Sequence, residues 1–291
     1  MIRQTYTLEL ITPCFCGGAD PSRAEIRSAS VRGAIRWWFR AVGNSSAEEA
    51  DVFGSAACNK GKASSVKLNA TIDKIGPEWR PPRFSPNDPD SYVWHYARES
   101  GKPAGSGRGV VGPRWNPAGA IPPGSVFHID VVSRQKPSAG FELALNCFLL
   151  LGSLGLRGTR GLGAFHCENL PLDLKGLLPQ LEQKGFTVRQ RGKEHVFDDY
   201  VKVIEDYASW LRYDLRKEYK ANRASPLGGI DPRQTSALRF RPLRTGRKLT
   251  WLAYEAPHER VLGPEARLPS PILEEKVFNG AAPRPPQRHR R

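Results

Sequence analysis

The order of strand-like and helix-like segments between residues 1 and 170 restricts the fold of this chain more than any other feature. Alternating apolar residues predict strands at residues 5–12, 66–72, 125–133 and 164–170, and helical spacing predicts helices at residues 31–42 and 141–151. Pro13 is expected to end the first strand, and Ser30 to cap the first helix. The order predicts an α+β fold with a ferredoxin-like βαββαβ core.

The predicted core is interrupted once and is followed by a second region. Residues 76–123 contain ten prolines in 48 positions, so they are expected to form a long loop insertion within a core domain at residues 1–170. Residues 171–278 are expected to pack on that core, with an additional helix at 198–220 and a hairpin of strands at 237–243 and 248–254. Residues 279–291 read as a basic, disordered tail.

Basic residues exceed acidic ones in this chain. The 291 residues include 44 Lys and Arg against 29 Asp and Glu, which gives a net charge of +15 and favours a polyanionic partner. No uncharged apolar run reaches the ~18 residues of a membrane span, and the N-terminal residues lack the features of a secretory signal. We therefore expect a cytoplasmic protein with no membrane partner.

Five cysteines are present without a Cys-x-x-Cys pair, at Cys14, Cys16, Cys58, Cys147 and Cys167. Neither a disulfide framework nor a zinc site is favoured by this spacing. Buried small apolar side chains are the preferred interpretation. The sequence therefore predicts no metal and no cofactor.

The first predicted helix carries a stripe of arginines. At a turn of about 100° per residue, Arg32, Arg36 and Arg40 fall within about 80° of one another, and Trp37 lies beside them. No acidic residue occurs between residues 26 and 47, which favours phosphates along the stripe and a base on the Trp37 ring. The alternative is an ordinary amphipathic surface helix with Trp37 in a subunit contact.

A second motif, Leu-Gly-Ser-Leu-Gly-Leu-Arg-Gly-Thr-Arg-Gly-Leu-Gly-Ala-Phe, occupies residues 151–165. It interleaves five glycines, Gly158 and Gly161 among them, with Arg157 and Arg160. Glycines free the backbone to turn its amides toward an anion, and arginines neutralise that anion, so the loop predicts a contact with a sugar-phosphate backbone. The motif is not a Walker loop, because no Gly-Lys-Ser/Thr follows. A tight helix-to-strand turn is the alternative.

Three further sets of residues are weaker candidates. Gly17 and Gly18 allow close approach of another backbone, and Asp20 beside them is a candidate for RNA cleavage or metal binding, although a loop carboxylate is more often a turn residue. Arg239 and Arg241 alternate along a predicted strand and read as an exposed basic surface. The six histidines have no catalytic partners in sequence, and no nucleophile elbow or His-Glu-x-x-His pair is present.

Taken together, these segments resemble the family of first subunits of the Cmr complex, the type III-B CRISPR effector. The resemblance rests on Thr-Pro at 12–13, Gly-Gly-Ala-Asp at 17–20, Glu-Ile-Arg at 25–27 and the Ser-x-Arg-Gly-x-x-Arg-x-Trp-x-Arg helix at 30–40. Residues 151–165 are similar to the glycine-rich loop that marks the RAMP superfamily. Residues 223–227 resemble a further motif of the family.

The resemblance implies a RAMP protein with an RRM-related core that acts as a non-catalytic RNA-binding subunit. Such a subunit would sit at the head of an antiviral ribonucleoprotein and hold the 3′-proximal CRISPR RNA. Its partners would be CRISPR RNA, target RNA and other RAMP subunits. Related backbone subunits cut target RNA with an aspartate near the position of Asp20, which makes Asp20 a weak catalytic candidate. The alternative is a RAMP endoribonuclease that processes or cuts CRISPR-related RNA with a histidine base and the glycine-rich loop. A protein-only scaffold is a third hypothesis.

The residues predicted to contact RNA come from all of these motifs. They are Gly17, Gly18, Arg27, Arg32, Arg36, Trp37, Arg40, Arg157, Gly158, Arg160, Gly161, Arg223, Arg239 and Arg241.

Overall fold

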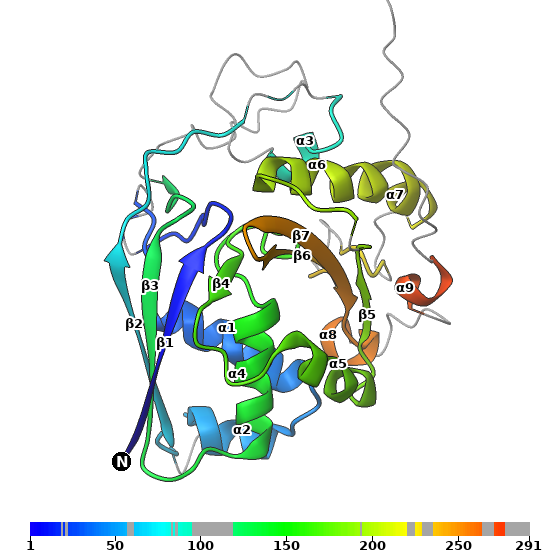
Figure 1. Ribbon diagram of the computed structural model, residues 1–291. Helices are drawn as coiled ribbons and strands as arrows, with labels where there is room; N and C mark the ends of the chain where they lie inside the picture. Colours follow the sequence, from blue (N-terminus) through cyan, green and yellow to red (C-terminus); the bar gives the residue numbers. More distant parts are fainter. Residues whose placement is uncertain are drawn as a thin grey trace, which may run out of the picture. The chain divides into compact units, whose positions relative to one another are not determined.

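The computed structural model describes residues 1–18, 20, 23–56, 61–82, 84, 87–94, 119–192, 194–219, 225–228, 235–263 and 271–276 (Figure 1). The chain divides into two compact units, Met1–Pro81 with Tyr96–Phe186 and Pro82–His95 with Thr187–Arg291. The first unit extends to Phe186, past the boundary predicted at residue 170, and the predicted insertion at 76–123 is divided between the units. Residues 95–118 and the predicted tail at 279–291 lie outside the described residues.

The first unit contains a four-stranded sheet with the order β2-β3-β1-β4, in which every neighbouring pair is antiparallel. Its strands are β1 (Ile2–Leu10), β2 (Val66–Lys74), β3 (Val126–Ser133) and β4 (Phe165–Cys167), so all four predicted strands are present with shifted ends. Tyr6 and Leu8 of β1 are buried opposite Ile129 and Phe127 of β3. On the other face, Asp130 accepts hydrogen bonds from the exposed side chains of Arg3 and Thr5.

Helices cover the apolar face of this sheet. Helices α1 (Ser28–Ala41) and α4 (Ala139–Leu151) lie side by side against it, as Figure 1 shows. Trp38 of α1 is buried and stacks on Phe186 with 5.8 Å between ring centroids. The cap predicted at Ser30 is wrong, because α1 starts three residues earlier than predicted: Arg27 occupies the N-cap without a side-chain hydrogen bond. The Ser28 hydroxyl instead accepts from the Ala70 amide and ties the helix to β2.

Two helices of the first unit were absent from the sequence prediction. Helix α2 (Ser46–Phe53) begins with a capping box, in which Ser45 and Glu48 each accept the other's backbone amide. The Ser-Ser-Ala-Glu run at 45–48 carries that signal. Helix α5 (Leu174–Gln183) is capped by Asp173 and buries Leu177 and Leu181, although Pro179 lies inside it. Both helices are short and therefore give a weak periodic signal.

The second unit holds a three-stranded antiparallel sheet with the order β5-β7-β6. Strands β6 (Leu238–Thr245) and β7 (Lys248–Glu255) form the predicted hairpin, and β5 (Thr187–Gln190) was not predicted. The predicted helix at 198–220 is observed as α6 (Tyr200–Trp210), a π-helical turn (Leu211–Leu215) and α7 (Arg216–Glu218). The short helices are α3 (Ser91–Trp94), α8 (His258–Val261) and α9 (Ile272–Glu275). Tyr207 of α6 stacks on Phe240 of β6 at 4.8 Å.

No helix among the described residues is long and apolar enough to cross a membrane.

Candidate nucleic-acid interface

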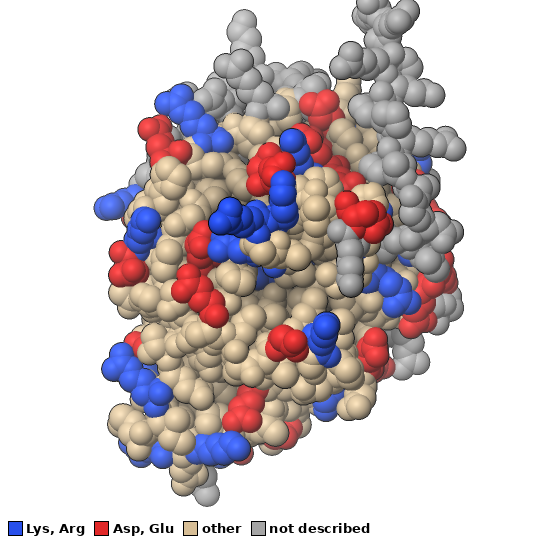
Figure 2. Space-filling model, viewed as in Figure 1, with Lys and Arg blue, Asp and Glu red and all other residues tan. Residues whose placement is uncertain are grey.

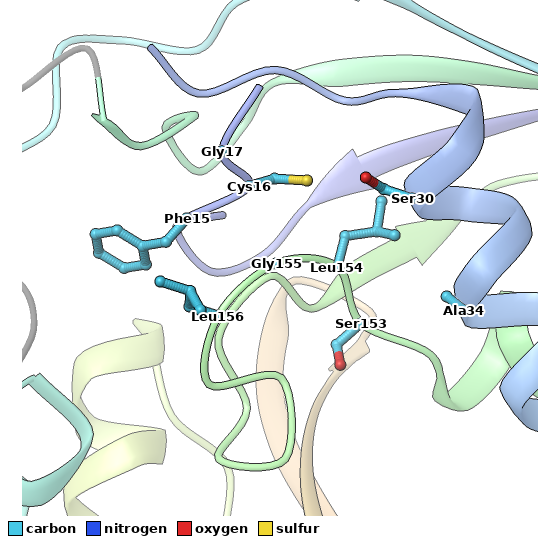
Figure 3. Close-up of a pocket in the computed structure, with 9 residues that line it drawn as sticks. All are labelled: Phe15, Cys16, Gly17, Ser30, Ala34, Ser153, Leu154, Gly155 and Leu156. Carbon is cyan, nitrogen blue, oxygen red and sulfur yellow. The ribbon is translucent and has the colours of Figure 1, made fainter. Parts of the chain in front are cut away.

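Three segments that are far apart in sequence meet at one pocket of the first unit (Figure 3). The pocket has a volume of about 340 Å³. Its lining comes from the loop after β1 (Phe15, Cys16 and Gly17), the first turns of α1 (Ser30 and Ala34) and the loop between α4 and β4 (Ser153, Leu154, Gly155 and Leu156). These segments correspond to the three motifs that the sequence marked as candidates, so the structure brings their backbones together.

Backbone hydrogen bonds hold the glycine-rich loop against the segment after β1. Leu156 donates its amide to the Phe15 carbonyl at 2.9 Å, and Gly163 donates to the Pro13 carbonyl at 2.9 Å. Gly155 has a φ of +79°, and a Cβ there would lie 2.6 Å from the Phe15 oxygen. Gly163 also has positive φ, and a Cβ would meet the Leu154 carbonyl. The fold itself therefore requires these glycines, as the tight-turn alternative states.

Gly158 and Gly161, the two glycines of this loop that were predicted to contact RNA, also have local structural reasons. A Cβ at Gly158 would meet the Ser153 hydroxyl. Gly161 is buried with a φ of 81°, and its carbonyl accepts a hydrogen bond from the Thr12 hydroxyl at 2.8 Å. The number of glycines in the loop is thus explained by packing, and their contacts with RNA stay a prediction.

The loop after β1 folds back on itself in a small antiparallel turn. Gly17 bridges to Ala24, and the Glu25 amide donates to the Cys16 carbonyl at 2.8 Å. Asp20 is exposed near the tip, and its carbonyl accepts from the Arg23 amide at 3.1 Å, which is the geometry of a turn residue. A Cβ at Gly18 would meet the Glu25 side chain, whereas a Cβ at Gly17 would meet nothing within 4 Å.

The arginines of α1 are engaged by the neighbouring helix α2. Arg36 donates to one carboxylate oxygen of Glu49, and Arg40 donates to both oxygens at 2.6 Å. Arg32 donates to the Phe53 carbonyl and lies over the Phe53 ring at 5.7 Å. The face is therefore not free of acid, because Glu49 lies beyond the acid-free stretch at 26–47, and the phosphate contacts of these arginines stay a prediction.

The ion cluster of Arg36, Arg40 and Glu49 combines a buried carboxylate with two partly exposed arginines. The Glu49 side chain is 7% exposed, whereas those of Arg36 and Arg40 are 44% and 57% exposed. The hydrogen bond from Arg40 is the largest influence on the carboxyl of Glu49, and it lowers the pKa below its usual range despite burial. The cluster keeps one net positive charge, on two guanidinium groups that reach solvent.

Trp37 lies between the pocket side and the arginine side of α1, about 60° from Ala34 and about 60° from Arg40. Ser30, Ala34 and Trp37 follow one another at spacings of four and three residues, so they share one face of the helix. At a turn of about 100° per residue, Ala34 is about 160° away from Arg32. Trp37 is half-buried and packs edgewise on Trp38 at 5.1 Å. The stripe and the pocket therefore face in different directions.

Arg27 and Arg157 are the predicted cations adjacent to the pocket lining. Arg27 immediately precedes α1; its side chain is 45% exposed and lies 3.6 Å from a carboxylate oxygen of Glu25. Arg157 follows Leu156, is half-buried and has a φ of 60°, which is unusual for a residue with a side chain. Arg160 is 2% exposed and donates to the Thr159 carbonyl at 3.3 Å, so the fold buries this predicted phosphate contact.

The predicted exposed basic surface on β6 is wrong. Arg241 is 1% exposed and Arg239 is half-buried, because both faces of β6 are covered and its apolar neighbours Leu238 and Phe240 are buried as well. Burial lowers the pKa of Arg241 to about 9 and also lowers that of Arg239. Alternation along a strand indicates a shared face but not which face meets water. Arg223 lies outside the described residues.

The cysteines within the described residues are buried and unpaired by disulfides, as predicted for Cys14, Cys16, Cys147 and Cys167. A hydrogen bond with Cys14 is the main influence that lowers the pKa of the Cys16 thiol to about 6, against the effect of burial. Burial raises the pKa of Cys167 to about 11. Among the described residues, no group of three or more His, Cys, Asp or Glu side chains could hold a metal ion.

The net charge is concentrated outside the described residues. These undescribed segments contain 15 of the 44 Lys and Arg but only 3 of the 29 Asp and Glu, so they carry +12 of the +15 net charge. Figure 2 accordingly shows acidic side chains beside basic ones over the face in view. Positive and negative charges are nearly equal in number in the described part of the chain, so its basic residues contribute through short-range contacts rather than through a broad positive potential.

The family model of the RAMP superfamily matches residues 7–166, which is more than half of the chain. The chain belongs to the RAMP superfamily. The match covers β2, β3, α1 and α4 completely, β1 from Thr7 onward and β4 as far as His166. The mixed α/β architecture of this RAMP protein agrees with the predicted fold class.

Curated relatives of this RAMP protein come from Pyrococcus furiosus. The CRISPR system Cmr subunit Cmr1-1 is 27% identical over 214 residues, which covers 70% of this chain and 54% of that protein. Cmr subunit Cmr1-2 is 52% identical over 42 residues, or 14% of this chain and 22% of that protein. The match thus spans about half of the length of Cmr1-1. The crystal structure of Cmr1 from P. furiosus in its apo form has a TM-score of 0.54 at 21% identity and covers 88% of each chain.

These relatives confirm the resemblance to the family of first Cmr subunits. The structural match shows a shared fold. Sequence reasoning missed Phe15, Ser153 and Leu156 in the pocket, and it missed Glu49 beside the stripe. Phe15 and Leu156 are apolar residues directly beside the glycine motifs in the sequence, and that adjacency is the signal that could have identified the pocket.

Proposed function

We propose that this RAMP protein is a non-catalytic RNA-binding subunit of a type III-B CRISPR effector ribonucleoprotein. In this role it sits at the head of the complex and holds the 3′-proximal CRISPR RNA during antiviral, RNA-guided defence. The names of the P. furiosus relatives, which are Cmr subunits, support the assignment to such a complex. Other RAMP subunits, CRISPR RNA and target RNA are the partners that this role requires.

The first unit is proposed to be a ferredoxin-like, RRM-related core. The order β2-β3-β1-β4 with antiparallel neighbours is the order expected of a βαββαβ fold, in which the two central strands are the first and third. Helices α1 and α4 connect the strands on the buried face. The opposite face carries polar side chains such as Thr5 and Asp130.

The observation that carries the RNA-binding proposal is the convergence of three motifs on one pocket. Gly17 leaves open space at the lining, because a Cβ there would meet nothing within 4 Å, and Arg27 and Arg157 supply positive charge beside the lining. RNA offers both phosphates for these cations and bases for the apolar lining. A chain that only supported other proteins would have no need for accessible glycine backbone beside cations.

Fluorescence anisotropy with a labelled 15-nucleotide single-stranded RNA tests the proposal. Charge reversal of Arg27 and Arg157 together should weaken binding to all RNA sequences alike and reduce the slope of log affinity against log salt by about 0.7 per lost phosphate contact. Arg3→Glu is the matched control, because Arg3 is 67% exposed on the open face of the same unit. Equal losses in the control and the double variant would refute a local RNA site.

The non-catalytic part of the proposal has a separate test. The purified protein is incubated with CRISPR repeat RNA, with and without divalent metal, and the products are resolved on a sequencing gel. Intact RNA is expected, since the described geometry of Asp20 is that of a turn residue. Cleavage that disappears in Asp20→Asn would instead establish the endoribonuclease. Isolation of the native complex, with sequencing of its RNA and subunits, tests the assignment to an effector.

A further inference from the structure

We propose that the pocket between the loop after β1, α1 and the glycine-rich loop receives an unpaired nucleobase, stacked on Phe15 beside Leu156. The inference rests on the proposed function and names the chemical group that this site recognises. It departs from the sequence prediction, which assigned the glycine-rich loop to phosphates.

The lining of the pocket is suited to a neutral, flat group. None of its nine residues is a lysine or an arginine, so an enclosed phosphate would have no cation within the lining. Figure 3 shows the Phe15 ring and Leu156 on one side of the paired backbone segments, and Cys16, Ser30 and Leu154 on the other. One end is therefore apolar, while the other combines Leu154 with a hydroxyl and a thiol group that suit the polar edge of a base or a ribose hydroxyl.

The apolar end has the features of a stacking platform. Phe15 is half-buried and is held by an edgewise contact with Trp79, at 5.9 Å and 77° between the rings. Leu156 is 53% exposed, which is unusual for a leucine beside a pocket. An aromatic face next to an exposed aliphatic side chain can sandwich any base, because every base has a π-face.

The polar end disfavours a phosphate. The hydrogen bond with Cys14 lowers the pKa of the Cys16 thiol, so its sulfur is available as a hydrogen-bond acceptor in the wall. In Figure 3 its sulfur is directed toward the hydroxyl of Ser30. A sulfur acceptor suits the N–H groups of a base or a ribose hydroxyl, whereas a phosphate has no donor group to offer it.

The backbone at the centre of the pocket leaves room for a ligand. Gly17 lines the pocket without a positive φ, and a Cβ there would meet nothing within 4 Å. The fold's own atoms therefore do not explain this glycine. A bound base would explain it, because a side chain at this position would occupy space that the ligand needs.

Removal of the bases tests this inference directly. The probes are a labelled 15-nucleotide oligouridine and an oligomer of the same length with abasic ribose, which keeps the phosphates but not the bases. The full chain should bind the abasic oligomer about tenfold more weakly, in the range of one stacked base. Phe15→Ala should bind oligouridine about tenfold more weakly and should lose discrimination against the abasic oligomer. Phe15→Trp should restore both properties.

A second variant and a control keep the test independent of folding. Gly17→Val adds a side chain where the fold has open space, so it should leave the melting temperature unchanged and weaken oligouridine binding about tenfold. Ile75→Ala, at a side chain that is 56% exposed in the same unit, should change neither affinity. Thermal melting followed by circular dichroism reports the fold of each variant.

The outcomes separate this inference from the proposed function. Equal binding of both oligomers by the full chain would overturn the inference that the pocket receives a base, while leaving the proposed RNA binding intact. The same result is expected if a segment of another protein fills the pocket. Unchanged affinity in both Phe15→Ala and Gly17→Val would overturn it as well. Failure of the full chain to bind any RNA would overturn both proposals.

Discussion

Replacement of Glu49 by glutamine distinguishes a structural role of the α1 arginines from a role in RNA binding. The carboxylate is buried between Arg36 and Arg40 and accepts three hydrogen bonds from them. Glu49→Gln keeps the shape of the side chain, removes its charge and turns an amide N–H₂ toward guanidinium donors. The variant therefore loses the organising group and leaves two exposed arginines without their shared counter-ion.

The cost in stability follows from the number and exposure of these bonds. A hydrogen bond to a charged group contributes about 1.5–3 kcal/mol when buried, but the two arginines are about half exposed and solvent screens their charges. We expect Glu49→Gln to lower the free energy of unfolding by about 2 kcal/mol. This corresponds to a fall in melting temperature of about 4–8 °C.

The stabilisation that the Glu49 carboxylate provides should depend on pH. The pKa of Glu49 is lowered in the folded state, chiefly by the hydrogen bond from Arg40. The stabilisation is therefore present above the ordinary glutamate pKa of about 4.3 and is lost as the pH falls through the lower folded value. The difference in unfolding free energy between the natural protein and Glu49→Gln should shrink toward zero as the solution is acidified below about pH 4.

Glu49→Gln should lower stability but raise RNA affinity if RNA phosphates bind the arginine stripe of α1. One charge removed about 7 Å from a phosphate at a dielectric constant of about 80 changes the binding energy by about 0.6 kcal/mol, or about threefold in affinity. Glu49→Gln should thus bind single-stranded RNA about threefold more tightly, with a salt slope steeper by about 0.7. Asp51→Asn removes the same charge from an exposed position of α2 and should cost less than about 1 kcal/mol of stability.

Two results would refute this reasoning. Unchanged stability of Glu49→Gln in urea unfolding would show that the ion cluster does not hold α2 against α1. Lower stability with unchanged RNA affinity and salt slope would show that the arginines are structural, and the predicted phosphate contacts of Arg36 and Arg40 would then be withdrawn. A double-mutant cycle with Arg40→Ala isolates the coupling between the two side chains.

Three further predictions concern the pocket and its loop. Arg157→Gly should be about 1 kcal/mol more stable than Arg157→Ala in urea unfolding, because glycine adopts the φ of 60° without strain. Both variants should weaken RNA binding equally. A glycine variant that is less stable than the alanine variant would contradict the observed backbone. Gly155→Ala should lower the free energy of unfolding by at least about 2 kcal/mol, because the φ of Gly155 is positive and a Cβ would lie 2.6 Å from the Phe15 oxygen. An unchanged urea midpoint would exclude the close packing of Gly155 against Phe15. The ultraviolet absorbance of the thiolate should rise with a midpoint near pH 6, and Cys16→Ser should remove this step, whereas Cys167→Ser, at a thiol with a pKa of about 11, should leave it unchanged. A step that survives Cys16→Ser would contradict the assigned thiol chemistry.

The sequence predicted the first sheet because each of its strands contains its own signal. Tyr6 and Leu8 alternate with polar residues, and the burial of β1 and β3 follows that alternation. Helix α4 is apolar over nearly its whole length, so its position was also evident. Helices α2 and α5 and strand β5 were missed because they are short, and their stability comes from caps and packing rather than from a long periodic pattern.

The candidate site was predictable only in part, for a different physical reason. The motifs that line the pocket were found because glycine is demanded by local backbone geometry, which leaves a mark in the sequence. The partners of the arginines were not found, because an ion pair depends on which distant segment packs beside the helix. Glu49 belongs to α2, a separate helix from that of Arg36, so no pattern within α1 could reveal it.

The separation of the stripe from the pocket has a consequence for how RNA could be read. Because Ala34 and Arg32 face directions about 160° apart on α1, one nucleotide cannot contact both the pocket and the stripe. A strand that places a base in the pocket must have its adjacent phosphates near Arg27 and Arg157, which flank the lining. Phosphate contacts on the stripe would then come from nucleotides farther along the strand or from another RNA. Loss of binding in the Arg27 and Arg157 variant should therefore depend on the presence of bases, whereas any effect of Glu49→Gln should be the same for normal and abasic RNA.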